Sequence, residues 1–230
     1  MALLGEAILG VWNDVDPAIE DDFNNWYLHE HIPERTSVPG MVRGRRYRAA
    51  EPGVPKFMAI YEALTMAVLT TGAYRDQLSN PTAWTQRVMP HFRFAQRGLC
   101  SVLGSLGQGV GGAAAVMHFR PRDGEADRLR GWLNDSALPS LMSQNQVSAA
   151  HAWAIEPGEP ASPTSALSPR VTEARPVNWV VVAEAADAAA AGAARAHFLG
   201  LDPAAAGAAD VVPYPVYQLL YVLDRRTPQP

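Results

Sequence analysis

The side chains best suited to chemistry lie in residues 26–35, Trp-Tyr-Leu-His-Glu-His-Ile-Pro-Glu-Arg. His31 is the leading candidate for a general acid or base, because an unperturbed imidazole titrates close to neutral pH. Residues four apart share a helix face, so His31 is expected beside Tyr27 and Arg35. Tyr27 could donate a hydrogen bond to a developing oxyanion, and Glu34 could orient the imidazole. The structural alternative is that His31 is a cation at the C-terminus of a helix.

The remaining metal- and cofactor-binding chemistry has little support. His29 is two residues from His31 and points elsewhere on a helix, where paired metal ligands need i, i+4 spacing. The single cysteine, Cys100, excludes a disulfide within the chain and a cysteine-based zinc cluster. We therefore predict no metal and no organic cofactor. Haem ligation by one of the six histidines is an alternative, but no motif stands behind it.

Two aromatic residues on predicted strands are candidates for substrate binding. Trp12 shares a strand face with Gly10, which could leave room for a ligand against an aromatic wall. Tyr61 and Glu62 face opposite sides of their strand, so one of them is expected to face the layer between the sheet and the helices. Core packing is the alternative for Trp12.

Four arginines on the strand over residues 41–49 could bind an anion. Alternation places Arg43 and Arg45 on one face and Arg46 and Arg48 on the other. Arginine suits bidentate contacts with carboxylates, and we select Arg43 as a positioning group. The alternative is a solvated edge or a set of interface pairs.

Further candidates come from the second predicted helical region. Trp84 and His91 share a helix face, and His91 could approach His31 across a pocket between the helices and the sheet. His118 and His151 are predicted to be structural, although they could form a second polar site if they share a face of neighbouring strands.

The elements that position these residues follow from the hydrophobic pattern and the turn residues. Pro33 is expected to end or kink the first helix. In the first half we predict strands over 6–13, 41–49, 56–63 and 98–103, and helices over 17–32, 65–79 and 81–92. In the second half we predict strands over 113–119, 147–155, 178–185 and 216–223, and helices over 124–142 and 187–199.

An internal repeat relates the two halves. Trp26 and Pro33 recur 106 residues later as Trp132 and Pro139, whereas His31 is replaced by Ala137. The order predicts an α+β fold of two tandem ferredoxin-like βαββαβ modules, residues 1–106 and 107–230, with the active site in the first. The Pro/Ser-rich stretch 157–176 is predicted to be a long hairpin loop, with a lid over a pocket as the alternative.

Three stretches carry a family resemblance. They are Phe23-Asn-Asn-Trp-Tyr27, Glu30-His-Ile-Pro-Glu34 and Val38-Pro-Gly-Met-Val-Arg-Gly-Arg-Arg-Tyr47. Over residues 6–63 the chain resembles the EthD-like branch of the dimeric α+β barrel superfamily. The resemblance implies two ferredoxin-like sheets packed into one barrel, each with a pocket beneath its own helices. Members include cofactor-free monooxygenases, isomerases, cyclases, decarboxylases and haem peroxidases, so the resemblance indicates the fold rather than the reaction.

Composition limits the partners. The net charge of −4 over 230 residues argues against nucleic acid, which usually selects a basic surface. No apolar run approaches the roughly 20 residues that span a bilayer. The N-terminus lacks the pattern of a signal peptide, and the lack of disulfides fits a reducing cytosol. We expect a cytoplasmic protein with a small-molecule substrate, whose exposed edges or helices could support a homodimer.

The leading functional prediction is a cofactor-free lyase or isomerase. It would dehydrate, decarboxylate, isomerise or cyclise a hydrophobic, aromatic or carbonyl-bearing substrate, with His31 as acid or base and Tyr27 and Arg43 assisting. The alternatives are a cofactor-free or haem-dependent oxidoreductase resembling a monooxygenase, a non-catalytic ligand-binding protein of a catabolic pathway, and a degenerate structural partner.

Overall fold

The strands form one antiparallel sheet that closes on itself. The computed structural model describes residues 2–53, 55–70, 72–157 and 178–225, and within them nine strands run in the order β7-β6-β4-β1-β3-β2-β9-β5-β8. Strand β5 also pairs with β7, so eight strands form a barrel and β8 lies at an edge. The strands are β1 (Ala7–Val15), β2 (Met41–Ala49), β3 (Phe57–Ala63), β4 (Phe92–Gly107), β5 (Ala113–Pro121), β6 (Val147–Ile155), β7 (Trp179–Ala185), β8 (Ala208–Pro213) and β9 (Tyr217–Asp224).

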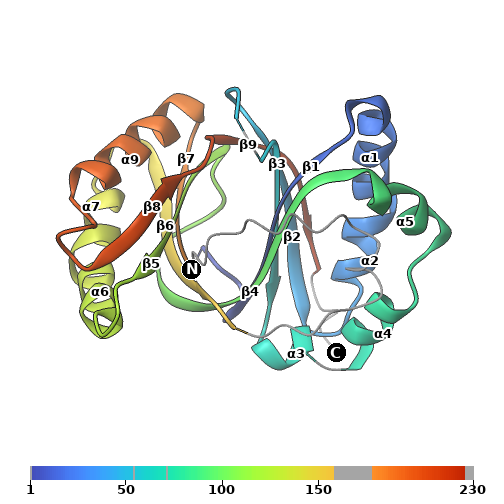
Figure 1. The fold of residues 1–230 in the computed structure, drawn as a ribbon, viewed down its shortest axis with the longest axis horizontal. Helices are drawn as coiled ribbons and strands as arrows, with labels where there is room; N and C mark the ends of the chain where they lie inside the picture. The colour runs from blue at the N-terminus through green and yellow to red at the C-terminus, as the bar shows by residue number, and fades with distance from the viewer. Residues whose placement is uncertain (1, 54, 71, 158–177, 226–230) are drawn as a thin grey trace.

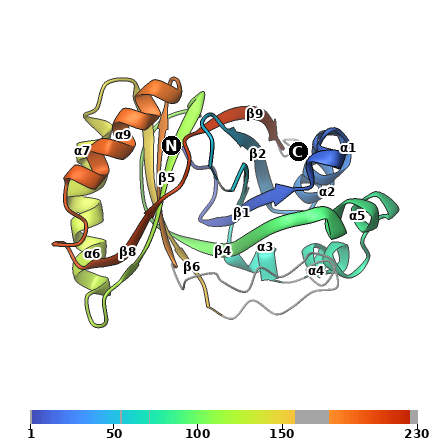
Figure 2. The same ribbon diagram turned by 45° about the horizontal axis from the view of Figure 1, so that its top comes forward.

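Helices cover the barrel on two opposite sides, as Figures 1 and 2 show. This arrangement is the predicted α+β fold, with two ferredoxin-like modules joined in one chain. None of the described helices is both long and apolar enough to cross a membrane. The first half contributes α1 (Glu20–Trp26), α2 (Ile32–Thr36), α3 (Met66–Thr70), α4 (Gly72–Ser79) and α5 (Ala83–Val88), and the second half contributes α6 (Ala126–Trp132), α7 (Leu138–Met142) and α9 (Ala188–Gly200).

The helix that carries His31 was predicted to end at residue 32, but it continues past Pro33 to Thr36. Proline lacks an N–H, and its ring clashes with the carbonyl four residues earlier. A π-helical turn over Tyr27–His31 precedes it, in which the N–H of Ile32 bonds to the carbonyl of Tyr27. A second π turn, Leu133–Ala137, stands at the same place in the repeat. The internal repeat therefore preserves this unusual π turn as well as the Trp and Pro positions that relate the two halves.

The core consists of three layers. One apolar cluster fills the barrel interior, and one lies beneath the helices of each half. Along β1, Ile8 and Trp12 face the interior while Leu9 and Val11 face the helices. Because both faces of the sheet are covered, the side chains on one face pack in the barrel interior and those on the other face pack against the helices.

The barrel interior also contains a buried charge network that joins the two halves. Arg43 Nε lies 2.7 Å from Glu62 Oε1, and Arg45 Nη2 lies 3.0 Å from the same oxygen. Arg45 Nη1 reaches Glu184 Oε1 of the second half at 2.6 Å, and His151 Nε2 lies 3.2 Å from that oxygen. Charges removed from water need such mutual pairing.

His118 should make the fold sensitive to acid. Its ring lies between Trp12 and Tyr214, with centroids 4.5 and 4.2 Å away, and neither ring nitrogen has a hydrogen-bond partner among the described residues. Burial lowers the pKa of His118 to about 3. The unfolded chain, in which histidine titrates near 6.5, therefore binds more protons between these two pH values. The stability associated with neutral His118 is complete above pH 6.5 and falls by about 1.4 kcal/mol per pH unit below it.

The measurement is urea unfolding at pH 7 and pH 5. Between these values, the free energy of unfolding should fall by about 2 kcal/mol more for the wild type than for His118→Phe. His29→Phe, which alters an exposed histidine, should keep the wild-type difference. An unchanged slope in His118→Phe would show that this imidazole does not resist protonation.

Four features of the fold differ from the sequence prediction or are not decided by the structure. Strand β8 was not predicted, and β4 begins at Phe92 rather than near Gly98. The division of the chain at residues 106 and 107 stays a prediction. Almost all of the predicted loop 157–176 lies outside the described residues.

Candidate functional site

The helix-facing side of the N-terminal sheet presents two arginines across a floor of small side chains. In the strand register, Arg46 of β2 pairs with Ala59 of β3, Ala59 with Val11 of β1, and Val11 with Arg97 of β4. All four residues lie on the helix side of the sheet, because alternate residues of each strand face the barrel. The two arginine backbones are thus about 14 Å apart, three strand spacings, with Ala59 and Val11 between them.

His31 lies over this floor within a set of aromatic rings. Its imidazole stacks on Trp26, with ring centroids 4.1 Å apart and an interplanar angle of 27°. The edges of Tyr27 and Tyr61 approach it with centroid distances of 5.1 and 6.2 Å. Trp26 and His31 are five residues apart, which is the π-turn spacing. The local backbone therefore explains how these two rings meet.

The environment keeps His31 neutral. Burial, and then the guanidinium groups of Arg35, Arg46 and Arg97, lower the pKa of His31 well below its ordinary value. The helix also continues past His31 to Thr36, so His31 does not occupy the helix C-terminus that the alternative of a helix-terminal cation required. Nδ1 has no hydrogen-bond partner among the described residues, so Glu34 does not orient the imidazole through this atom. A neutral imidazole with a free nitrogen can accept a proton.

Arg46 is the most enclosed cation of the site. Its guanidinium carbon lies 3.5 Å from the centroid of the Tyr27 ring, and 4.6 and 4.7 Å from those of Phe23 and Phe57. Nη2 donates to Asn24 Oδ1 at 3.0 Å, while Nη1 has no partner among the described residues. Burial lowers the pKa of Arg46 to about 10, which still leaves it charged at neutral pH.

The other two arginines are supported by Tyr74. Arg35 is buried, its guanidinium lies 5.7 Å from the Tyr74 ring centroid, and Nη1 donates to Gln77 Oε1 at 3.2 Å. Arg97 Nη2 donates to the Tyr74 hydroxyl. Glu34 lies 3.8 Å from Arg35, and burial raises the pKa of its carboxyl. The site therefore combines several cations with one carboxylate that is easier to protonate than usual.

A separate network fixes the Trp26 ring on which His31 stacks. The indole Nε1 donates to Glu30 Oε1 and to Thr85 Oγ1, each at 3.2 Å. Thr82 donates to the same Glu30 oxygen at 2.5 Å. These contacts tie the His31 helix to α5, so the orientation of the aromatic surface beside the imidazole is set from outside the site.

Solvent reaches part of this layer. Val11 lies in the middle of the central strand and faces the helices, yet it is only half-buried. Its neighbour Arg97 and the overlying His31 are also half-buried, whereas Ala59 and Tyr61 are fully buried. The helices therefore leave the floor near Val11 accessible, which a reactive imidazole requires.

The second half provides an internal control for the role of these residues. At the repeat positions, His31 is replaced by Ala137, Arg35 by Leu141 and Arg46 by Ala152. The apolar cluster beneath the helices of that half includes all three replacements. The same topology therefore folds without the imidazole or the guanidinium groups, which argues against a purely structural need for them.

Two predicted site residues lie on the other side of the sheet. Trp12 and Arg43 face the barrel interior, because of strand alternation, and neither can share a site with His31. Arg43 instead pairs with Glu62. Gly10 does not leave room for a ligand, since a Cβ there would lie 2.6 Å from the ring of Trp12 itself. Of the predicted pair Tyr61 and Glu62 on β3, Tyr61 faces the helices and Glu62 faces the barrel interior.

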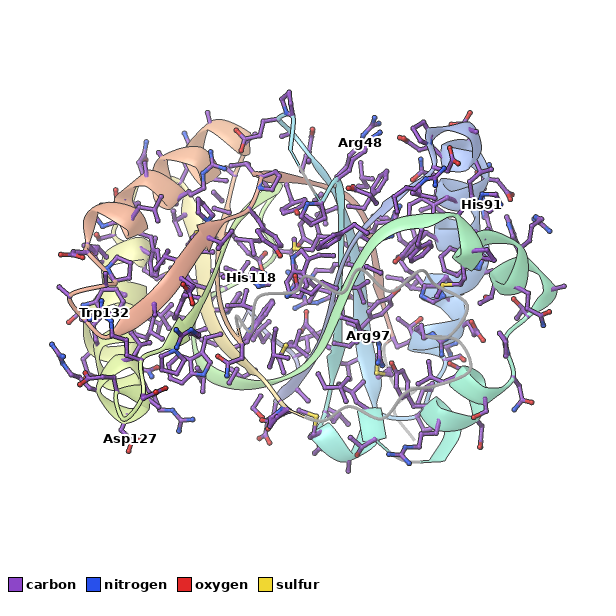
Figure 3. All side chains as sticks on the ribbon, viewed as in Figure 1. Arg48, His91, Arg97, His118, Asp127 and Trp132 are labelled. Atoms are coloured by element: carbon purple, nitrogen blue, oxygen red, sulfur yellow. The ribbon has the colours of Figure 1, made fainter. Side chains whose placement is uncertain are left out.

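The predicted approach of His91 to His31 is wrong. His91 is exposed at the end of its helical segment, and Figure 3 shows it beside the helices of the first half. Trp84 is half-buried and donates from Nε1 to Asp22 at 3.0 Å, so it belongs to the outer packing of this layer. His118 and His151 both face the barrel interior, and Figure 3 shows His118 near the middle of the barrel.

Sequence reasoning missed the contributions of Arg46 and Arg97. Alternation already placed Arg46 opposite to Arg43, and choosing the face that Tyr61 shares would have selected it. Arg97 lay outside the predicted strand, which began at Gly98. Trp26 was used only as a marker of the internal repeat. Its contact with His31, five residues later, was not predicted because that spacing brings side chains together only in a π turn.

Comparison with known proteins establishes the fold. No protein-family model and no curated protein matches the sequence. Solved structures do match. An anthrone oxidase-like protein is 12% identical, with a TM-score of 0.65 over 97% of this chain and 95% of that one. A protein described as a monooxygenase, from Fusobacterium nucleatum subsp. nucleatum, is 10% identical, with a TM-score of 0.60 over 97% and 96%. A haem-binding protein from Thermus thermophilus is 12% identical, with a TM-score of 0.51 over 94% and 92%.

At these identities the similarity shows the fold alone, an α+β barrel built from two ferredoxin-like modules. The assignment to the EthD-like branch stays a prediction. The fold thus admits several chemistries, and the residues of the site must decide between them.

Two of the buried histidines, His118 and His151, do not suit the axial position of a haem. An axial histidine needs a free nitrogen facing an open plane. Both nitrogens of His151 are bonded, to Ser105 at 2.9 Å and to Glu184 at 3.2 Å. His118 is enclosed between the rings of Trp12 and Tyr214. Within the described part of the chain, no group of three or more His, Cys, Asp or Glu side chains could hold a metal ion.

Proposed function

We propose that the protein is a cofactor-independent oxidoreductase. Its substrate would be an aromatic compound that carries an acidic C–H group next to a carbonyl group or a phenol ring. The observation that carries the proposal is neutral His31, with an unpaired buried nitrogen, among the positive charges of Arg35, Arg46 and Arg97. A neutral base beside fixed cations favours removal of a proton from carbon, because the cations stabilise the enolate that forms.

The reaction needs no external reductant. His31 takes a proton from the substrate carbon, and the electron pair of the C–H bond becomes an enolate. The enolate reduces molecular oxygen and forms a C–O bond, which yields a hydroperoxide on that carbon once a proton is returned. Loss of water then leaves a ketone. In total, R₂CH₂ and O₂ give R₂C=O and H₂O. The aromatic rings around His31 suit a flat apolar substrate.

The oxidoreductase is favoured over the lyase or isomerase predicted first. The structural similarity to proteins described as anthrone oxidase-like and as a monooxygenase supports it. Both readings start with the same proton transfer, so His31 keeps its role in each. They differ in whether oxygen is consumed. Self-association and membership of the EthD-like branch stay predictions.

The test is oxygen uptake with anthrone as the substrate. Purified protein should consume one O₂ per anthrone and form anthraquinone, whose absorbance reports the product. Activity should persist after chelation and without added flavin, because the proposed step uses neither. Turnover of anthrone that continues at the same rate without oxygen would instead support a lyase or isomerase. Failure to turn over a panel of anthrones and acidic phenols, with the fold intact, would contradict the proposal.

A further inference from the structure

Two unpaired hydrogen-bond donors lie on neighbouring strands at the floor of the site. Arg46 Nη1 and the Tyr61 hydroxyl are buried, and neither has a partner among the described residues. Arg46 is on β2 and Tyr61 on the neighbouring β3, where they face the same helices. Tyr61 pairs with Gly44 and Arg46 with Ala59, so the two side chains are diagonal neighbours in the sheet.

Both groups keep their protons at neutral pH. Burial raises the pKa of Tyr61 well above its ordinary value, so the hydroxyl is a donor. Arg46 stays charged, and Nη2 donates to the neutral amide of Asn24 at 3.0 Å. Its guanidinium is otherwise in contact with aromatic rings. Among the described residues, no carboxylate forms an ion pair with Arg46.

This arrangement is costly unless something completes it. A buried donor without an acceptor costs about 1–3 kcal/mol, and a buried charge without a counter-charge costs more. The second half avoids the cost by placing Ala152 at the position of Arg46. The first half keeps both donors beside the accessible side chains of Val11 and His31.

We propose that the site takes its substrate as an organic anion, whose charged oxygen is bound by Arg46 Nη1 and the Tyr61 hydroxyl. The class is an aromatic compound bearing a carboxylate or an ionised phenol. The inference rests on the proposed function for the place of the site, and it adds the charge of the substrate. The anion supplies the acceptor that both donors lack and the negative charge that Arg46 lacks. It leaves the rest of the ring system to stack near Trp26 and His31.

The experiment compares two probes of nearly identical shape, 2-naphthoate and 2-naphthamide, by isothermal titration calorimetry. The wild type should bind the carboxylate at least tenfold more tightly than the amide, and this preference should weaken as salt is raised. Tyr61→Phe removes one donor without changing the ring, and should lower the preference several-fold. Arg46→Met should abolish the preference.

Matched controls exist on the same strands. Arg48→Met alters the next arginine on the same face of β2, which is half exposed and paired with Glu20, and should keep the preference. Tyr47→Phe removes a hydroxyl that faces the barrel and should also keep it. If Arg46→Met fails to fold, Tyr61→Phe decides. Equal binding of the two probes, binding of neither, or an unchanged preference in Tyr61→Phe would overturn the inference.

Failure of this inference can be told apart from failure of the proposed function. In His31→Ala the preference for naphthoate should persist, because that variant removes the base and leaves both donors. A protein that prefers naphthoate but consumes no oxygen would retain the anion site and lose the proposed reaction. Oxygen uptake with neutral anthrones, without any preference for the carboxylate, would support the proposed reaction and contradict the anion site.

Discussion

Replacing His31 by alanine is expected to lower kcat for oxygen-dependent turnover by about 10²–10⁴-fold, the usual contribution of a positioned acid or base. The substitution removes the proton acceptor and leaves the cations in place. The enolate would still be stabilised but would form slowly. The measurement is the rate of anthraquinone formation under saturating oxygen, together with the circular dichroism and melting temperature of the variant.

The control for this substitution is the neighbouring histidine. His29 is exposed and two residues away, so His29→Ala should leave kcat within about twofold of the wild type. The pH profile provides a second readout. Because the pKa of His31 lies well below 6.5, the base is already neutral at pH 6.5. The rate should therefore stay level from pH 8 to pH 6.5 and fall only as acid protonates the imidazole. Full activity of a folded His31→Ala variant would remove this histidine from the mechanism.

The second large effect concerns stability. Replacing Glu184 by alanine should lower the free energy of unfolding by about 3–5 kcal/mol, because the buried Arg45 then keeps only one of its two carboxylate partners, Glu62. Glu184 also accepts the N–H of Gly111 at 2.8 Å and contacts His151, so three groups lose an acceptor. Urea denaturation at pH 7 measures the loss. An exposed pair gives the control, since Arg120→Ala, whose partner is Asp210 at 2.7 Å, should cost at most about 1 kcal/mol.

The Glu184 carboxylate also makes the stability of the fold depend on pH in the acidic range. Burial alone would raise the pKa of Glu184, but Arg45 and His151 outweigh it and hold the pKa at about 2. Since the folded value lies below the unfolded one of 4.5, the stabilisation is complete above pH 4.5 and is lost as the pH falls towards 2. Glu184→Ala should flatten this part of the stability profile. A loss below about 1 kcal/mol at pH 7 would mean that the network contributes little.

Local sequence patterns were enough to predict most of the fold. Strands β2 and β6 match the predicted residues 41–49 and 147–155, because apolar alternation and adjoining turn residues agree there. The path of β4 was beyond such patterns. This strand spans Phe92–Gly107 and pairs with both β1 and β6, so its length is set by partners far away in the chain. Polar residues such as Arg93 and Gln96 interrupt the apolar pattern, so the local sequence does not predict this part of the strand.

The site was predicted only where local geometry determines it. The grouping of His31 with Tyr27 follows from helix spacing, and the structure shows those rings in contact. Which face of the sheet packs against that helix is decided by tertiary packing. Strand alternation alone is compatible with either face. Selecting Arg43 instead of Arg46 was therefore an error of strand face that moved the proposed cation to the opposite side of the sheet.

The buried network also shows what it means to hold both modules in one chain. Two identical subunits related by a two-fold axis must make every contact twice, and any change in one subunit appears in the other. In this chain Arg45 contacts both Glu62 and Glu184, while its repeat counterpart His151 contacts Glu184. Freed from symmetry, the two halves can divide their tasks. The second half has an apolar layer beneath its helices, while the first half keeps buried arginines in the corresponding layer.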